Sequence, residues 1–251
     1  ITMLVDQAIA AKELPGAVVL INHNGHTIFE RAYGNRKLAG EPGLDGQASP
    51  AEPMTENTIF DMASLSKCLS TATAIMQLYE AGKLRFDDPV AKYLPDFAAN
   101  GKEHVTIREL LTHYSGLPPD ISLKDPWGLA APDKAEGIRR ALASPLKTVP
   151  GTHFEYSDIN FITLGALVEK LSGQPLDEYA QQHIFTPLGM ANTKYHPFAK
   201  ACGPRRAFGS AVASVAPDTR LDMVGYTRPF LNSTCHKGDW NAALVIPHTA
   251  P

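Results

Sequence analysis

The sequence predicts an α+β fold in which helices flank an antiparallel sheet and a helical subdomain is added. Two strand-like runs flank Asn24-Gly25, a dipeptide that is the strongest short signal for a β-hairpin. Several helical patterns follow this hairpin along the chain. A hairpin alone is a marginal sheet, so further strands are needed, and the segment after residue 199 is the place left for them. The 251 residues, 44% hydrophobic and 20% charged, suffice for one large domain or two intimate ones.

Helices are predicted where apolar residues recur at helical spacing and a stop signal follows. The pattern over residues 62–81 ends at Gly82, and glycine is favoured just beyond a helix end. Thr106 and Glu109 have the spacing of a capping box, which marks the start of a helix. The predicted helices span residues 2–14, 62–81, 106–117, 133–144, 160–173 and 175–189, with a short helical turn after Asp87.

Other stretches lack a helical or strand period. Residues 35–57 and 116–135 are rich in residues that favour turns, and they are predicted to form loops. The pattern weakens after residue 199, and the last residues, from 222 onward, predict neither helix nor strand. The sheet is therefore expected to be incomplete at the C-terminal end.

Composition excludes several classes of protein. The net charge is -3 and no run of Lys and Arg exceeds a pair, so neither nucleic acid nor an anionic membrane surface is an expected partner. No apolar stretch is long enough to span a bilayer. The three cysteines are scattered and the nine histidines show no HExxH pair, so no disulfide framework or metal site is expected. No motif calls for an organic cofactor. No signal peptide is visible, which leaves periplasmic, secreted and cytoplasmic locations open.

Lys67 is the only charged residue between Met62 and Tyr79, in a helix that is otherwise apolar or neutral. We expect its ammonium to be enclosed, and burial lowers a lysine pKa and so favours a general base. Ser64 lies three residues earlier on the same helix face, where such a base would activate its hydroxyl. Ser64 would also lie in the first turn, where free N–H groups favour an oxyanion. In the opposing interpretation, Lys67 reaches solvent and Ser64 merely caps the helix.

The S-x-x-K spacing alone is a weak signal, because it occurs twice. Ser144 and Lys147 have the same spacing, but Pro145 favours a loop or a helix end there instead of an enclosed pair. A second group of polar residues, Tyr156, Ser157 and Asp158, precedes an apolar helix. At such a junction Tyr156 could relay a proton, or Ser157 or Asp158 could simply cap the helix while Tyr156 packs on the core.

Together these stretches resemble the serine β-lactamase and penicillin-binding-protein superfamily. The phrases "FDMASLSK", "TIRELLTHYSGL", "PGTHFEYSDINFITLGALVEKLSG" and "FTPLGMANTKY" occur in the family order and cover most of residues 14–196. The resemblance is strongest to the class C β-lactamase-like branch, with its D-Ala-D-Ala carboxypeptidases and β-lactamase-fold esterases. It implies a β-lactamase/transpeptidase-like catalytic region over 1–198, with an α/β part (1–60) and a helical part (61–198), followed by an atypical, truncated segment over 199–251.

The resemblance also implies roles for individual residues. Ser64 corresponds to the acylated nucleophile, Lys67 to its base partner, and Tyr156 to the tyrosine that shuttles protons to the leaving group. Asp158 stands where the class C pattern Y-x-N has asparagine, and Ser157 lies between them. A carboxylate there would pair with Lys67 and raise its pKa, which shifts the role of base towards Tyr156.

The family's third motif, K-T-G or H-x-G on a strand, has one textual match, His236-Lys237-Gly238. We treat His236 and Gly238 as a weak candidate, because no strand-like run precedes them and little chain follows them to complete a sheet.

Three hypotheses of function follow. The first is a serine hydrolase that acts through an acyl-enzyme on a small ester, an amide or a D-amino-acid peptide. The second is a catalytically incomplete relative that binds peptide or peptidoglycan. The third is a homo-oligomer, in which a partner chain supplies the missing strands to an open sheet edge.

Overall fold

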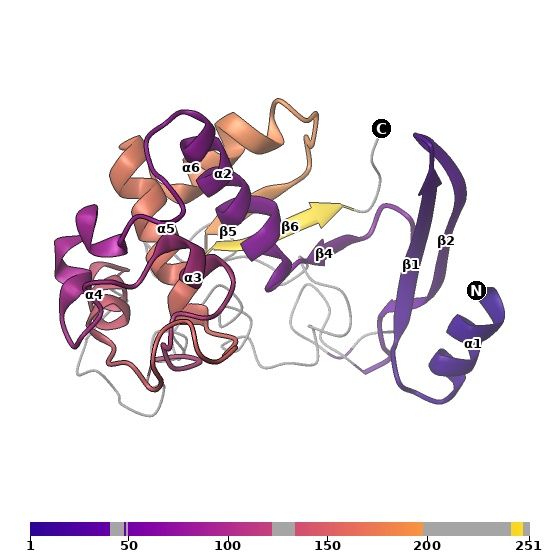
Figure 1. Ribbon diagram of the computed structural model, residues 1–251. Helices are drawn as coiled ribbons and strands as arrows, with labels where there is room; N and C mark the ends of the chain where they lie inside the picture. The colour runs from indigo at the N-terminus through magenta and orange to yellow at the C-terminus, as the bar shows by residue number, and fades with distance from the viewer. Residues whose placement is uncertain (41–47, 49, 122–133, 198–241, 248–251) are drawn as a thin grey trace.

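The computed structural model describes residues 1–40, 48, 50–121, 134–197 and 242–247, and its elements form an α+β arrangement (Figure 1). The α-helices are α1 (Thr2–Ala10), α2 (Thr73–Glu80), α3 (Ile107–Leu111), α4 (Lys134–Ala143), α5 (Asp158–Ser172) and α6 (Leu176–Ala180). The strands are β1 (Gly16–His23), β2 (His26–Lys37), β3 (Glu52–Pro53), β4 (Ile59–Asp61), β5 (Lys194–Pro197) and β6 (Ala242–Pro247). Four short segments complete the elements: the π-helical η1 (Lys67–Ala72) and η4 (Gln181–Phe185), and the 3₁₀ turns η2 (Val90–Lys92) and η3 (Pro95–Ala98).

The predicted hairpin is present at one end of the molecule. β1 pairs antiparallel with β2, and β3 adds a short third strand to β2 (Figure 1). Asn24 and Gly25 form the two-residue connection with φ angles of 49° and 81°. Positive φ at both positions matches the right-handed twist of the two strands, which is why Asn-Gly is favoured in such turns. The local chemistry of two residues therefore sets this part of the fold.

A second sheet has the strand order β4-β6-β5, with both pairs antiparallel. Its central strand, β6, corrects the expectation that residues from 222 onward contain neither helix nor strand. The run "AALVIP" is too short to show a period, and its pairing with β4 and β5 makes it a strand. Figure 1 shows this sheet between the hairpin and the helices.

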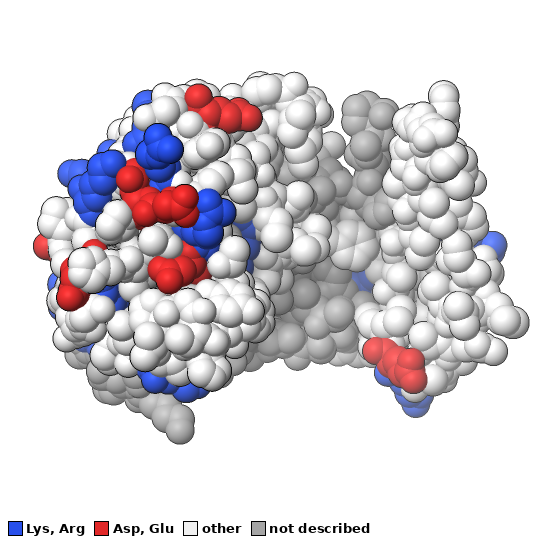
Figure 2. Space-filling view, viewed as in Figure 1, with Lys and Arg blue, Asp and Glu red and all other residues white. Residues whose placement is uncertain are grey.

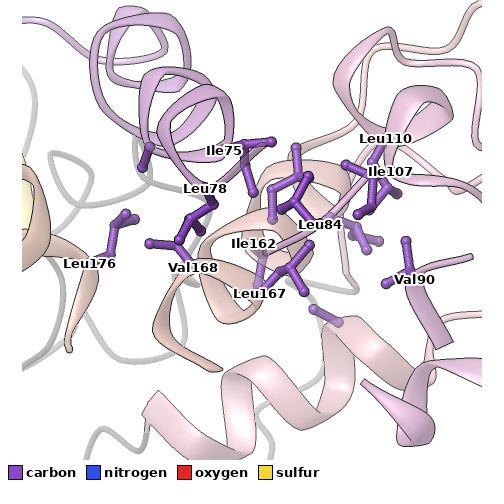
Figure 3. Close-up of a cluster of buried hydrophobic side chains, with 14 of the residues drawn as sticks. Ile75, Leu78, Leu84, Val90, Ile107, Leu110, Ile162, Leu167, Val168 and Leu176 are labelled. Carbon is purple, nitrogen blue, oxygen red and sulfur yellow. The ribbon is translucent and has the colours of Figure 1, made fainter. Parts of the chain in front are cut away.

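The core lies among the helices, around α5. Nine of the ten residues from Ile159 to Val168 are buried, so the middle of this helix is enclosed on all sides. Figure 3 shows the apolar side chains that α2, α3, α5 and α6 contribute, with others from the segments between them. The helix stops at Gly173, which has a φ of 76° in the left-handed region, as its sequence predicts. The same packing brings η1 and the start of α5 together.

Two helices end earlier than their apolar patterns predict. The capping box of Thr106 and Glu109 is present, but α3 ends at Leu111 instead of continuing to 117. His113 has a φ of 61° and Gly116 a φ of 79°, and residues in the left-handed region terminate a helix. The chain then forms a loop over residues 112–121 that crosses the start of α5. Helix α1 likewise ends at Ala10, two residues before the positive φ of Lys12.

Charge is unevenly distributed over the face in Figure 2. Side chains of both signs gather on the helical part, whereas α1, β1 and β2 show few of them in this view. No residue of α1 is buried, and the side chains of Met3 and Leu4 are exposed by 68% and 66%. Within the described residues, no helix combines the length and the apolar character that crossing a membrane needs.

Gly116 tests how tightly the loop over residues 112–121 is packed. A Cβ atom at Gly116 would lie 2.3 Å from the carbonyl oxygen of Thr148, whereas one at Gly101, with nearly the same φ of 78°, would meet nothing within 4 Å. We expect Gly101→Ala to lower the free energy of unfolding by about 1–2 kcal/mol, the cost of the left-handed conformation. Gly116→Ala should lower it several-fold more, as measured by urea denaturation. Equal losses in the two variants would show that the loop yields easily.

Candidate active site

Ser64 stands at the start of the helical segment that contains η1, and it is exposed. The residue before it, Ala63, has a φ of 45°, a conformation uncommon for a residue other than glycine. The N–H groups of Leu65 and Lys67 donate to carbonyls of the preceding turn, that of Lys67 to Ser64 at 3.1 Å. The N–H of Ser64 makes no backbone hydrogen bond within the described part of the chain. Among the described residues, the Ser64 hydroxyl and an N–H without a backbone partner are thus presented together at one turn.

Lys67 begins η1, which is wound as a π-helix. Such segments are rare and often occur at functional sites. The side chain of Lys67 is only 10% exposed, so the expected enclosure is present and the interpretation in which Lys67 reaches solvent is wrong. Its Nζ lies 3.2 Å from Ser64 Oγ and 2.5 Å from Asp158 Oδ1, and 5.1 Å from the ring centre of Tyr156. The structure therefore brings Ser64, Lys67, Tyr156 and Asp158 to one place.

The carboxylate of Asp158 decides the charge of Lys67. Burial, the largest single influence, lowers the pKa of Lys67, as the sequence alone suggests. The hydrogen bond and the negative charge of Asp158, with smaller contributions from Tyr156, together outweigh burial and raise the pKa above its ordinary value. Lys67 is thus a cation near neutral pH, and it donates to Ser64 Oγ. The expectation that enclosure favours a neutral base is wrong here, because an ion pair compensates for burial. The alternative expectation, that Asp158 pairs with Lys67 and raises its pKa, is confirmed.

Ser157 supports the site instead of capping α5. It occupies the position before the helix, yet its hydroxyl makes no cap and donates to the carbonyl of Pro118 at 2.6 Å. The N–H of Asp158 donates to the carbonyl of Pro119 at 2.7 Å. Ser157 is fully buried, whereas Tyr156 beside it is 45% exposed. The loop over residues 112–121 therefore clamps the start of α5 and leaves the tyrosine open to solvent.

The second S-x-x-K match forms no such arrangement. Ser144 donates to the carbonyl of Arg140 at 3.1 Å, while the exposed Lys147 forms an ion pair with Glu155 at 2.9 Å. Equal spacing in sequence thus gives different surroundings. The third-motif candidates, His236 and Gly238, lie outside the described residues. Among those described, no group of three or more His, Cys, Asp or Glu side chains is placed to hold a metal ion.

Sequence reasoning missed His113, which lies against Tyr156 with 4.5 Å between ring centres. Its Nδ1 lies 3.1 Å from the backbone N of Ser157 and 3.2 Å from Nδ2 of the buried Asn160. Burial, followed by the charge of Lys67, lowers the pKa of His113 below its usual value, although Asp158 acts the other way. The only signal in the sequence is that His113 lies in a phrase matching the family, within the helix predicted over residues 106–117.

The comparisons with known proteins agree on one family. The beta-lactamase family model matches residues 1–238. A protein of Escherichia coli O157:H7 that bears the name "Putative D-alanyl-D-alanine carboxypeptidase" is 31% identical over 235 residues, which cover 89% of this chain and 52% of that protein. An N-acetylmuramyl-L-alanine amidase of Bacillus subtilis (strain 168) is 33% identical over 216 residues, which cover 82% of this chain and 48% of the amidase.

A solved structure supports the same assignment. The octameric penicillin-binding protein homologue from Pyrococcus abyssi matches with a TM-score of 0.65 and 25% sequence identity, over 98% of this chain and 53% of that one. The β-lactamase-like fold expected from the sequence is therefore confirmed. The chain spans about half the length of the curated relatives it matches.

Replacing Asp158 tests the electrostatic assignment of Lys67. Asp158→Asn removes the negative charge that raises the pKa of Lys67 and leaves burial, which lowers it. We expect the pKa of the Lys67 ammonium to be lower in this variant than in the wild type, as followed by NMR of the lysine side chains. Asp88→Asn, which removes the partner of Lys92, is the matched control and should leave Lys67 unchanged. A Lys67 titration insensitive to Asp158→Asn would refute the assignment.

Proposed function

The chain belongs to the beta-lactamase family, and on that premise we propose that it is a serine hydrolase that forms an acyl-enzyme on Ser64. The observation that carries the proposal is the enclosed ammonium of Lys67, held by Asp158 and donating to Ser64 Oγ at 3.2 Å. A cation at this distance stabilises the negative charge that develops on the oxygen during attack.

The proposed reaction is an acyl transfer in two halves. Ser64 Oγ bonds to the carbonyl carbon of the substrate while its hydroxyl proton is relayed through the phenolic oxygen of Tyr156. The bond to the alcohol or amine then breaks, and Tyr156 returns the proton to that leaving group. Water next attacks the acyl-enzyme and releases the acid. The N–H of Ser64 serves as one donor to the oxyanion, since it makes no backbone hydrogen bond within the described residues.

The substrate class we favour is an ester or the amide of a D-amino-acid peptide. The names of the Escherichia coli and Bacillus subtilis relatives point to amides of the bacterial cell wall. Asp158 places a carboxylate where class C β-lactamases have an amide. An ionised carboxylate only accepts hydrogen bonds, so unlike the amide it cannot donate to a substrate carbonyl. We therefore expect poor turnover of β-lactams. The division into a catalytic region over 1–198 and an atypical segment over 199–251 is part of the same proposal.

A second candidate is a relative that binds peptide or peptidoglycan without turning it over. The pairing of Lys67 with Asp158 favours it, because a lysine that stays protonated cannot take the serine proton. Self-association is compatible with either function. The octameric assembly of the Pyrococcus abyssi homologue supports it, as does β1, which forms one edge of its sheet among the described strands.

Covalent labelling separates the two candidates. We expect a fluorophosphonate probe to add one adduct to the wild type and none to Ser64→Ala, as read by intact mass. The matched control is Ser144→Ala, which removes the serine of the second S-x-x-K match and should be labelled like the wild type. A folded wild-type protein without an adduct would favour the binding function. An adduct that persists in Ser64→Ala would show that another residue is the nucleophile.

Substitution of Tyr156 tests its role in proton transfer. Tyr156→Phe keeps the ring near Lys67 and removes the hydroxyl, so acylation should slow by about a hundred- to ten-thousand-fold while the fold is retained. The rate of probe labelling measures this loss. Tyr114→Phe alters a neighbouring, partly exposed tyrosine and should leave the rate unchanged. A normal rate in Tyr156→Phe would assign the proton to another group.

A further inference from the structure

We propose that His113 is a positioning residue, which holds Tyr156 beside Lys67 through a neutral imidazole whose Nδ1 carries no proton. This inference rests on the proposed function, since positioning has a consequence only if Ser64 reacts. It assigns a role to a residue that no part of the acyl-transfer scheme uses, and it predicts which ring nitrogen is protonated.

His113 holds the chain on both sides of Tyr156. The carbonyl oxygen of His113 accepts the N–H of Glu155 at 2.9 Å, and its Nδ1 accepts the N–H of Ser157 at 3.1 Å. The imidazole also lies on the phenol, with 4.5 Å between ring centres and planes tilted by 32°. Tyr156 itself is exposed, so its own burial does little to hold it. The two hydrogen bonds to its neighbours and the ring contact set its place.

The hydrogen bonds around the ring define its protonation state. Ser115 Oγ donates to Asn160 Oδ1 at 2.6 Å, so the amide nitrogen of Asn160 faces His113 Nδ1, at 3.2 Å. Nδ1 therefore meets two N–H donors, one from Ser157 and one from Asn160. An imidazole nitrogen that accepts hydrogen bonds has no proton, so the neutral ring carries its proton on Nε2. If Nδ1 were protonated, its N–H would face the N–H groups of Ser157 and Asn160, and none of the three donors would have an acceptor there.

The charges around the ring also influence whether the His113 imidazole is protonated. Lys67 on η1 and Asp158 on α5 are the charged groups that act on it, Tyr156 is the titratable neighbour, and the side chain of Glu155 is engaged by Lys147. Burial and Lys67 oppose the imidazolium, whereas Asp158 favours it, and the net effect keeps the pKa of His113 below 6.5. The backbone adds a constraint, because a φ of 61° at a residue with a side chain persists only where surroundings enforce it.

Two variants of His113 distinguish the role of its hydrogen-bond acceptor from the role of its aromatic ring. His113→Asn keeps an acceptor close to the position of Nδ1, suits the left-handed backbone and cannot titrate. His113→Phe keeps an aromatic ring on Tyr156 but leaves the N–H groups of Ser157 and Asn160 without their acceptor. We expect His113→Phe to slow probe labelling of Ser64 by about tenfold or more, because buried donors are left unpaired. His113→Asn should recover most of that rate.

The pH profile supplies a readout that a merely structural role would not move. The wild-type labelling rate should fall as the pH drops through the pKa of His113, below 6.5, and this fall should be absent from His113→Asn. If His113→Phe fails to fold, the comparison of pH profiles between the wild type and His113→Asn still tests the positioning role. Independently of activity, ¹⁵N NMR of the wild type should show Nδ1 as the unprotonated nitrogen.

The outcomes distinguish the inference from the function on which it rests. If the wild type is labelled but both variants match it in rate and pH profile, the positioning role is overturned and the proposed function stands. A protonated Nδ1 also overturns it. If the wild type takes no label, the proposed function fails, and the positioning role fails with it.

Discussion

A buried ammonium needs a partner, and this constraint organises the described structure. Lys67 lies on η1 and its carboxylate partner, Asp158, begins α5. The two elements must therefore lie close enough for Lys67 Nζ and Asp158 Oδ1 to form an ion pair at 2.5 Å. The apolar packing of α2 and α5 holds them at that separation (Figure 3). A small slip between them would leave an uncompensated charge in the interior, which costs several kcal/mol. Core packing and the geometry around Ser64 are therefore set by the same contact.

The identity of the partner changes what the lysine can do. Opposite a neutral amide, burial would favour the free amine, whereas opposite a carboxylate the ammonium persists. In the proposed reaction Lys67 then acts by its charge, and proton transfer passes to the tyrosine beside it. The loop over residues 112–121 becomes important for this reason, because it places Tyr156 through backbone contacts on either side. The site depends as much on this loop as on the residues that carry the chemistry.

Local chemistry was predictable from the sequence, and contacts between distant segments were not. The Asn24-Gly25 turn, the capping box of Thr106 and the stop at Gly173 each depend on a few adjacent residues, and all three are present. The strand β6 depends on pairing with β4 and β5, which no short window of sequence contains. Nor does spacing distinguish Ser64 from Ser144, since only folding decides which lysine is enclosed. The pairing of Lys67 with Asp158, which raises the pKa of Lys67, joins two distant helices and was expected only from the resemblance to the family.

The burial of α5 on all sides bears on how such a site can change during evolution. An enclosed helix cannot rotate or slide to admit a larger side chain, because every face of its middle part is already in contact. New chemistry must then enter by isosteric exchange at its first turn, where one end of the helix meets Lys67. Aspartate and asparagine have nearly the same volume and differ in charge, so an exchange at position 158 alters the electrostatics while leaving the packing almost untouched. A rigid helix with a variable tip offers one route by which a single scaffold acquires different reactivities.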